Sequence, residues 1–401
     1  MPAHPALPAD RGTRTFRMYS GLTFAFAWVP VMYTHFTVTR GWSPDEYASL
    51  WSTYYLAMVA CELPWGWLAD RIGRRPVLVA GPLVLGAAFL LLGRAQSLAG
   101  AHLLMAVVGG AHALISGADS AWLYDHVAAA GRLGDAFREE SAAHCWRLFG
   151  VCVLDVAGGC VAFWLGTPAV FQLAAGVMLV SALLAAQLPE ERAAGARPKP
   201  SVAAARAALG APGVTWVLAW FVAVFVLLRM GFQLYQPTLI AAGATDLRLH
   251  GLVLGGLNLA AGLSVYVVLR VFGALGERRT AGFVLLLLAL SFAGLSAAPG
   301  WLVPALFVLQ QVAFGFLQPV GRTSLNQRIP AGERASLLSA QSLLARLAFA
   351  ALLFAVPWDA AFTAQLPVTY LVLAGVALLA AVLAVTLHPE HRTRLESALR
   401  G

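Results

Sequence analysis

The sequence is poor in charged residues. Asp, Glu, Lys and Arg make up 11% of its 401 residues, while hydrophobic residues make up 60%. A soluble globular domain carries about 25% charged and about 45–50% apolar residues. The mean hydropathy of +0.74 points the same way. This composition excludes a soluble globule and predicts a polytopic membrane protein without a soluble domain of useful size.

Cysteine is scarce as well, and the common catalytic motifs are missing. The four cysteines, Cys61, Cys145, Cys152 and Cys160, lie in or beside apolar runs without the spacing of metal ligands, so we interpret them as core packing. The sequence has no His-Glu-x-x-His, no Gly-x-Ser-x-Gly and no Gly-x-x-x-x-Gly-Lys. These absences argue against an enzyme and against ATP as the driving force, and we expect no cofactor and no metal.

Lysine is nearly absent, because only Lys199 among the 27 positively charged residues is a lysine. Together with the abundance of alanine, this composition points to a bacterial genome rich in G+C. The formal net charge of +8 is compatible with nucleic-acid binding, but the positive residues lie in segments between apolar runs, which is typical of membrane topology. We therefore expect the lipid bilayer as a partner, and no nucleic acid.

Twelve apolar runs are long enough for transmembrane helices, each of which needs about 20 residues. The first run is too long for the core of a signal peptide and lacks a convincing cleavage site, so we expect it to remain as the first helix. The predicted spans are 16–37, 45–67, 76–94, 99–121, 146–166, 168–188, 213–237, 249–272, 281–298, 301–321, 335–356 and 365–387.

A polar segment broken by prolines, residues 189–212, divides this series into two halves. The fold class that we predict is an all-α polytopic membrane protein with twelve transmembrane helices in two six-helix bundles, 16–188 and 213–387. Residues 1–15 and 388–401 are predicted to be tails on the same side of the membrane as the linker.

The positive residues fix the predicted orientation. Nearly all of them lie in the tails, the linker and alternate loops; only Arg40, Arg94 and Arg248 fall on the other side, and Arg229 lies inside a span. Loops rich in Lys and Arg stay on the cytoplasmic side during insertion. The sequence therefore predicts a multi-pass protein of the bacterial inner (plasma) membrane with cytoplasmic N- and C-termini.

Residues 66–75, Gly-Trp-Leu-Ala-Asp-Arg-Ile-Gly-Arg-Arg, form a short, densely charged stretch between two apolar runs. We interpret them as a loop that brings its flanking helices into antiparallel contact, with glycines for close backbone approach and the arginines on the wet side. The stretch resembles the signature between the second and third helices of the major facilitator superfamily, and Glu62-Leu-Pro strengthens the resemblance. The predicted signature residues, which would also act as a cytoplasmic gate, are Glu62, Gly66, Asp70, Arg71, Gly73, Arg74 and Arg75.

The two halves also resemble each other at an offset near 200 residues. Further residues are similar to a bacterial subset of the superfamily: Leu123-Tyr124-Asp125, Gln318-Pro319 and Asn326. The resemblance implies two pseudo-repeated bundles with a substrate site between them near the membrane midplane. The matches at this offset are Arg147-Leu148 with Arg346-Leu347, Gly73-Arg-Arg with Gly276-Glu-Arg-Arg, His112 with Gln311, and Asp119 with Gln318.

Three ionisable residues in predicted spans are candidates for proton coupling. Asp155 lies about 13 Å into the fifth span, where a buried carboxyl is suited to carrying a proton; alternatively it is a structural group bonded to a neighbouring helix or to Arg229. Gly158 just beyond it would let another helix approach. His112 and Asp119 share a face of the fourth span and would relay protons, unless His112 is an ordinary hydrogen-bonding residue.

The sequence departs from the superfamily at one position of the fourth helix. Drug/proton antiporters carry an arginine there about four residues before a glycine, whereas this chain has Met105 and Ala106 ahead of Gly109. Coupling would therefore depend on Asp155 and His112 instead.

A polar stripe on the seventh span predicts a cavity wall, because Arg229, Gln233 and Gln236 share one helix face. Arg229 would pair with an acidic substrate or a buried carboxylate, or it would snorkel toward the outer interface. Aromatic residues such as Trp51 belong by default to the interface belts. The predicted cavity and substrate residues are Arg229, Gln233, Gln236, Tyr33, Tyr235, Asn258, Gln311, Phe314 and Gln318.

These features together favour a secondary transporter that works as a monomer by alternating access. The leading prediction is proton-coupled efflux of amphipathic small molecules of drug or natural-product type. The alternative within transport is uptake or facilitated passage of a polar metabolite, favoured if the polar stripe forms a tight pocket. An alternative of another class is a regulatory membrane protein that transports nothing.

Overall fold

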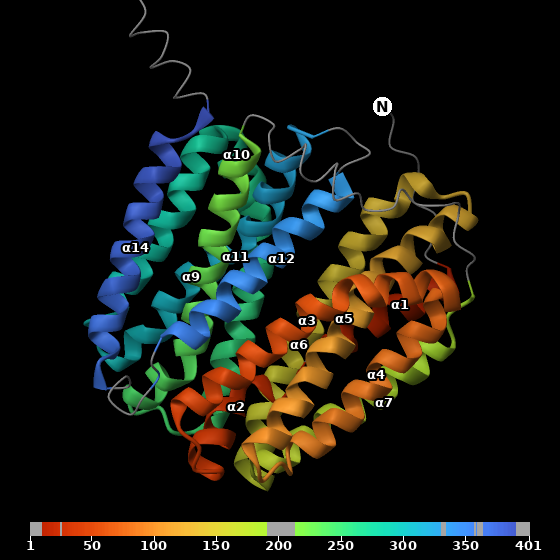
Figure 1. The fold of residues 1–401 in the computed structure, drawn as a ribbon, viewed down its shortest axis with the longest axis horizontal. Coiled ribbons are helices and arrows are strands. Elements are labelled where there is room, and N and C mark those ends of the chain that lie inside the picture. Colours follow the sequence, from red (N-terminus) through yellow and green to blue (C-terminus); the bar gives the residue numbers. More distant parts are fainter. Residues whose placement is uncertain are drawn as a thin grey trace, which may run out of the picture. The chain divides into compact units, whose positions relative to one another are not determined.

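The computed structural model describes residues 10–24, 26–190, 213–329, 334–356, 358 and 364–389. The side chains of a few helical residues, Asp70 among them, also lie outside this description. Within the described ranges the chain is helical and contains no strand, which confirms the all-α class (Figure 1). Most of the linker 189–212 and of the two tails falls outside the described residues.

The described residues form two compact units. The first unit comprises residues up to Met32 and from Leu56 to Glu190, and the second comprises Tyr33–Tyr55 and the residues from Gly213 onward. Both units thus include parts of the predicted 16–188 segment. The predicted bundle boundaries stay a prediction.

In the first unit, local sequence explains where helices begin. The Asp10 side chain accepts a hydrogen bond from the Thr13 N–H at 2.7 Å, and Ser97 accepts one from the Gly100 N–H at 3.2 Å, so both are N-caps. Gly166, with φ of +84°, makes the turn between α6 and α7. The helices are α1 (Arg11–Thr23), the second part of α3 (Pro44–Ile72), α4 (Arg74–Leu92), α5 (Leu98–Ala129), η3 (Leu133–Asp135), α6 (Ala136–Leu165) and α7 (Thr167–Ala186).

The first predicted span, 16–37, is not one helix, so the prediction is wrong there. After α1 the chain continues through a 3-10 turn η1 (Val29–Val31), α2 (Met32–Thr34) and the π-helical turn η2 (His35–Thr39). Pro30 lies in η1, and its missing N–H disfavours a continuous α-helix. Gly158 of α6 packs against this break, since a Cβ at Gly158 would lie 1.9 Å from the Ala27 carbonyl oxygen.

In the second unit the predicted spans 249–272 and 281–298 form one helix, α10, interrupted only where Gly276 has a φ of +71°. α10 packs along both α11 and α14, while α9 packs against α11 and α12. The helices of this unit are the first part of α3, α9 (Val214–Ala241), α10 (Leu247–Leu295), η4 (Gly300–Leu302), α11 (Val303–Asn326), α12 (Arg334–Ala355) and α14 (Leu366–Thr386).

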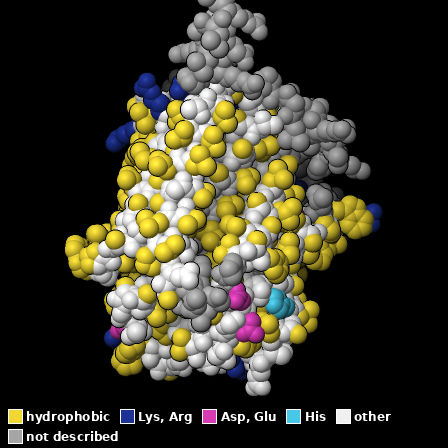
Figure 2. Space-filling view, turned by 60° about the vertical axis from the view of Figure 1, so that its left-hand side comes forward, with side chains coloured by type: hydrophobic (Ala, Val, Ile, Leu, Met, Phe, Trp, Pro, Cys, Tyr) yellow, Lys and Arg dark blue, Asp and Glu magenta, His cyan; other side chains and the backbone are white. Residues whose placement is uncertain are grey.

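Among the described residues, 10 helical stretches are long and apolar enough to cross a membrane, with α10 supplying two of them. The regions of the first two predicted spans are not among them. The first is broken after α1, and the second, α3, carries Asp45, Glu46 and Glu62. Hydrophobic side chains are spread over the face in Figure 2, Lys and Arg side chains lie toward its margins, and Asp and Glu side chains lie in its lower part. Leu371 and Leu379 of α14 are 56% and 60% exposed, as expected for side chains that face lipid.

Candidate functional site

The signature stretch is a tight turn and not the ten-residue loop that the sequence suggested. α3 extends to Ile72 and α4 begins at Arg74, so that only Gly73 separates them, with a φ of +90° that favours glycine. Gly66 is therefore inside a helix. α4 packs along α5 and α7, and its antiparallel contact with α3 stays a prediction.

The arginines of this turn have three different environments. Arg74 is buried, and its Nε donates to the Asp125 carboxylate of α5 at 2.6 Å. Arg75 donates to the Ala186 carbonyl at 2.6 Å. Arg71 is exposed and stacks on Trp67, 3.8 Å from the ring centroid. The prediction that all three stay on the wet side is thus wrong for Arg74, because a carboxylate within the fold compensates its charge.

The remaining signature residues give no gate contact to describe. Glu62 is half-buried on α3, and a Cβ at Gly66 would meet nothing within 4 Å. The Asp70 side chain lies outside the described residues.

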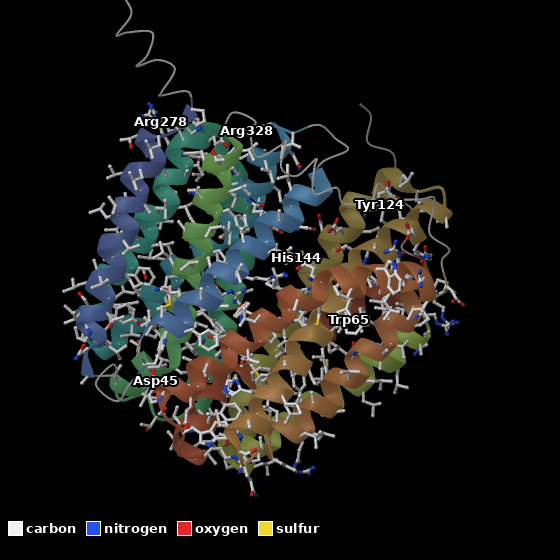
Figure 3. All side chains as sticks on the ribbon, viewed as in Figure 1. Asp45, Trp65, Tyr124, His144, Arg278 and Arg328 are labelled. Carbon is white, nitrogen blue, oxygen red and sulfur yellow. The ribbon has the colours of Figure 1, made fainter. Side chains whose placement is uncertain are left out.

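The second unit repeats the turn with its charges exchanged. Gly276, with its positive φ, precedes Glu277, which accepts two hydrogen bonds from Arg328 at 2.7 and 2.9 Å. Gly276, Glu277 and Arg328 lie 203 residues after Gly73, Arg74 and Asp125, respectively. Figure 3 places Arg278 and Arg328 at one end of this unit and Asp45 toward the other.

The three candidates for proton coupling all lie in the first unit. Asp119 bonds to Arg147 of α6 at 2.8 Å, and the Arg147 guanidinium lies 4.2 Å from the Phe24 ring centroid. The His112 ring contacts Phe24 and Phe26 at centroid distances of 5.0 and 5.4 Å. Asp119 therefore forms an ion pair between helices and also accepts a hydrogen bond from the Ser120 N–H at 2.6 Å, and the relay with His112 stays a prediction.

Asp155 is only 2% exposed on α6. Its helix also packs closely on α1, since a Cβ at Gly150 would lie 1.6 Å from the Gly21 carbonyl oxygen. The Gly158 contact with Ala27 confirms that a backbone approaches just beyond Asp155, although the partner is the break after α1 and not a helix. Asp155 thus lies inside a tightly packed part of the first unit.

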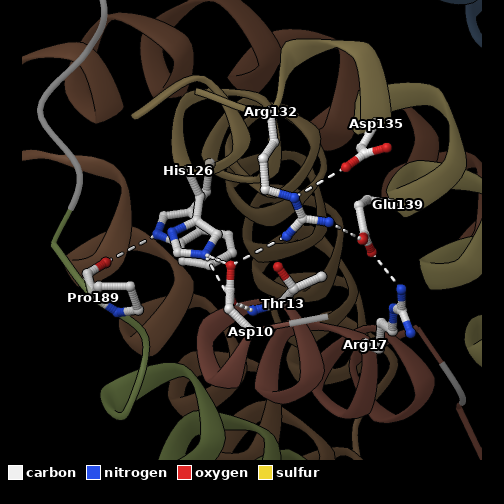
Figure 4. A network of polar contacts seen from close by, with 9 residues as sticks. Asp10, Thr13, Arg17, His126, Arg132, Asp135, Glu139 and Pro189 are labelled. Carbon is white, nitrogen blue, oxygen red and sulfur yellow. Dashed lines mark hydrogen bonds and ion pairs between the residues drawn. The ribbon is translucent and has the colours of Figure 1, made fainter. Parts of the chain in front are cut away.

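A network of polar contacts lies where α1 begins (Figure 4). Arg132 contacts Asp10 at 3.6 Å and Glu139 at 3.1 Å, and Arg17 bonds to Glu139 as well. His126 contacts Asp10 at 3.1 Å. Although burial opposes the effect, the hydrogen bonds from the Thr13 N–H and from His126 lower the pKa of Asp10. This network therefore stabilises the ionised form of Asp10.

The polar stripe of α9 lies in the second unit. α9 extends to Ala241, so Arg229 lies about 22 Å from one end of the helix and about 18 Å from the other, at 1.5 Å per residue. This central position argues against snorkelling, for which a residue must lie near a helix end. A charged side chain at the centre of a transmembrane helix costs about 2.5–3.5 kcal/mol on insertion scales.

The two glutamines of the stripe differ in their contacts. Gln236 accepts hydrogen bonds from the backbone N–H groups of Tyr33 at 3.0 Å and Thr34 at 3.4 Å. Gln233 is 4% exposed, and neither polar atom of its amide has a hydrogen-bond partner among the described residues. Burying an amide without hydrogen-bond partners costs free energy. Among the polar side chains of the stripe, Gln233 is therefore the one best placed to bond to a ligand.

Aromatic rings surround Arg229. Its guanidinium lies 5.3 Å from the centroid of Phe225 and 5.8 Å from that of Phe232, and Trp51 lies 6.0 Å from Phe232. Of the described residues, none places a carboxylate within ion-pair distance of Arg229. We call the following residues the Arg229 cluster: Trp51, Tyr54, Tyr55, Phe225, Arg229, Phe232, Gln233 and Phe349.

The sequence analysis missed most of this cluster, because it assigned such aromatics to interface belts. The signal was the spacing: Phe225 and Phe232 lie four residues before and three residues after Arg229, and therefore on its helix face. Trp51 and Tyr55 are likewise four residues apart on α3.

The other predicted cavity residues have surroundings of their own. Tyr235 packs on Phe307, with centroids 5.8 Å apart, and its hydroxyl donates to the His250 carbonyl. On α11 Gln318 and Phe314 are exposed and Gln311 is half-buried, as is Asn258 on α10. The buried glutamine of α11 is Gln310, which donates to Ser291 at 3.0 Å.

Comparison with known proteins decides the family. The family model of the Major Facilitator Superfamily matches residues 16–275. The chain belongs to the Major Facilitator Superfamily. No curated protein sequence matches it at a significant level.

Solved structures of superfamily proteins share the fold. A mutant of the nucleoside transporter NupG matches with a TM-score of 0.80 at 14% identity, over 93% of this chain and 99% of that one. A bacterial homologue of the human lysosomal transporter Spinster, inward-facing and unoccupied, matches with a TM-score of 0.72 at 13% identity, over 96% and 97%. As a superfamily member, the protein is a membrane transporter for small molecules and not an enzyme.

Proposed function

We propose that this superfamily member is a secondary transporter of twelve transmembrane helices in two pseudo-repeated six-helix bundles, working by alternating access. The charge-exchanged pairs Arg74–Asp125 and Glu277–Arg328 support the repeat, because both follow a glycine of positive φ at one common offset. The N- and C-termini lie in the cytoplasm, and the protein works as a monomer in the bacterial inner membrane.

The Arg229 cluster contacts the substrate. The observation that carries this proposal is the central position of Arg229 on α9 without a carboxylate partner among the described residues, next to an amide without a hydrogen-bond partner. Polar groups of this kind within a transmembrane helix bundle mark substrate pathways more often than structural sites. The surrounding rings provide apolar surface, so the substrate is an amphipathic small molecule.

The direction of transport is efflux in exchange for protons, with Asp155 as the proton carrier. Its burial on α6 suits a group that changes protonation during the cycle. His112 and Asp119 remain candidates for a relay, and the signature residues remain candidates for the gate.

Uptake of a polar metabolite is the second candidate. The polar stripe of Arg229 and Gln233 favours it, and so does the fold shared with NupG, which is a nucleoside transporter.

Flux in liposomes tests the proposal. The purified protein is reconstituted with an internal pH dye, and amphipathic compounds and polar metabolites are added in turn under an imposed membrane potential. Proton movement that depends on an amphipathic compound, and that Asp155→Asn abolishes, supports coupled efflux.

Asp246→Asn is the matched control, because Asp246 pairs with Arg248 beside a helix start, outside the proposed machinery. Substrate movement without proton flux, unchanged in Asp155→Asn, contradicts the coupling. Flux of polar metabolites alone favours the second candidate.

A further inference from the structure

The charges around Arg229 are unbalanced. Arg74 and Arg147, for example, each bond to a carboxylate of a neighbouring helix, at 2.6 and 2.8 Å. Arg229 has aromatic neighbours and no such partner among the described residues. The cluster therefore has a positive potential that an anion would neutralise.

The hydrogen-bonding groups of the cluster fit one small planar anion. A guanidinium offers two parallel N–H donors that match a carboxylate. Gln233 lies four residues after Arg229, on the same helix face, and its buried amide has both a donor and an acceptor without a partner. A carboxylate bound to Arg229 thus has a further N–H donor one helical turn away.

The remaining surface of the cluster is aromatic. Phe232 contacts Trp51 in an edge-to-face arrangement at 85°, and Tyr55 contacts Phe349 at 89° with centroids 5.2 Å apart. Such arrangements present ring faces and edges that pack on another aromatic ring. A substrate with an aromatic body and a carboxylate end would match both parts of the cluster.

We propose that the Arg229 cluster binds an aromatic monocarboxylate, with the carboxylate on Arg229 and Gln233 and the ring against Trp51 and Phe232. The proposal rests on the transport function above and names its substrate class. It excludes lipophilic cations, because these would meet like charge at Arg229.

Binding to the purified full-length protein in detergent tests the substrate class. The probes are phenylacetate, phenylacetamide and phenethylamine, which share an aromatic body and differ in the charge of the end group. We expect phenylacetate to bind at least roughly tenfold more tightly than the amide and the amine, as a charge-assisted bidentate contact implies. The readout is the change in tryptophan fluorescence, to which Trp51 contributes.

Variants assign the preference to the cluster. Arg229→Gln should reduce the affinity ratio of phenylacetate to phenylacetamide to about one, while Arg248→Gln, an arginine outside the cluster, should keep it. Gln233→Glu places a carboxylate beside Arg229 and should remove the preference while Arg229 is retained. This second variant keeps the test decisive if Arg229→Gln fails to fold.

Two kinds of result overturn the proposal. One is equal affinity, or no affinity, for the three probes in the native protein; the other is a carboxylate preference that survives both Arg229→Gln and Gln233→Glu. The same probes in liposomes separate this proposal from the transport function. Binding of phenylacetate through Arg229 without movement of any compound contradicts transport and keeps the site, whereas flux of neutral or cationic compounds without carboxylate preference contradicts the substrate class alone.

Discussion

In the first unit Arg74 bonds to Asp125 and Arg147 bonds to Asp119, whereas in the second unit Arg229 lies between the rings of Phe225 and Phe232. An ion pair between helices uses both charges internally and holds the helices together. An arginine with only aromatic neighbours keeps its N–H donors for a ligand. The second unit also has an ion pair of the first kind, between Arg328 and Glu277. The contrast is therefore between an arginine paired with a carboxylate and the half-buried Arg229, for which we propose a ligand as the partner.

The largest expected effect comes from breaking the pair that holds α4 to α5. Asp125→Ala removes the carboxylate that accepts the hydrogen bond from the buried Arg74, and we expect a loss of about 3–5 kcal/mol in the free energy of unfolding. Unfolding by denaturing detergent, followed by circular dichroism, measures it. The exchanged double variant Arg74→Asp with Asp125→Arg copies the charge order of Glu277 and Arg328, and should recover most of the loss. A loss below about 1 kcal/mol in the single variant would contradict a structural role for the pair.

Removing the Arg229 charge should change the free energy of unfolding in the opposite direction. Arg229→Gln is expected to raise the free energy of unfolding by about 2 kcal/mol in the absence of substrate, because the cost of a charge at the centre of a transmembrane helix is removed. The same measurement of unfolding applies, with Arg248→Gln as the exposed control. A destabilised Arg229→Gln protein would indicate that Arg229 has a structural partner and would remove the contrast between the units.

The third effect on stability is expected at Gly158, where the backbone of α6 contacts the break after α1. Gly158→Ala should cost about 1–3 kcal/mol, because its Cβ would lie 1.9 Å from the Ala27 carbonyl oxygen and the break after α1 must shift. Gly256→Ala on α10 is the matched control in the second unit, since a Cβ there meets nothing within 4 Å. That control should gain up to about 1 kcal/mol from helix propensity. Thermal unfolding of the two variants side by side measures both changes in stability. Equal effects would contradict the close packing at Gly158.

The smallest effect concerns pH. The pKa of Asp10 is lowered from its usual value of 3.8, so its carboxylate stabilises the fold above that pH, and this contribution is lost as the pH falls through the lower pKa of the folded state. Asp10→Asn keeps an N-cap side chain but removes the charge. We expect it to cost at most about 1 kcal/mol at neutral pH, because the Asp10 side chain is 39% exposed and screened by solvent.

Melting temperatures of the two proteins across a pH series test this last prediction. The difference between them should be largest near neutral pH and should shrink as the pH falls through the lowered pKa of Asp10 in the folded state, below which Asp10 is protonated in both folded and unfolded chains. A difference that does not vary with pH would show that the Asp10 charge contributes nothing to the network of Figure 4.

Periodicity and composition predicted some parts of the candidate site and not others. The stripe of Arg229 and Gln233 follows from helical spacing alone, and the structure keeps both on α9. The role of Trp51 was not predictable, because Trp in a membrane protein is most often an interface residue. The contact between Trp51 and Phe232 joins segments far apart in the chain, which no local pattern reports.

The sequence by itself determined the membrane class, the all-helical composition and most helix positions, because apolar runs about 20 residues long dictate them. It also determined the family, through a signature whose glycine is required by a backbone of positive φ at Gly73. Only the tertiary structure decided that the first span breaks against Gly158, that Arg74 is buried on Asp125, and that Arg229 has aromatic rings around it and no carboxylate partner among the described residues. The physical reason is that hydropathy acts on each segment separately, whereas close packing and charge compensation depend on which segments become neighbours.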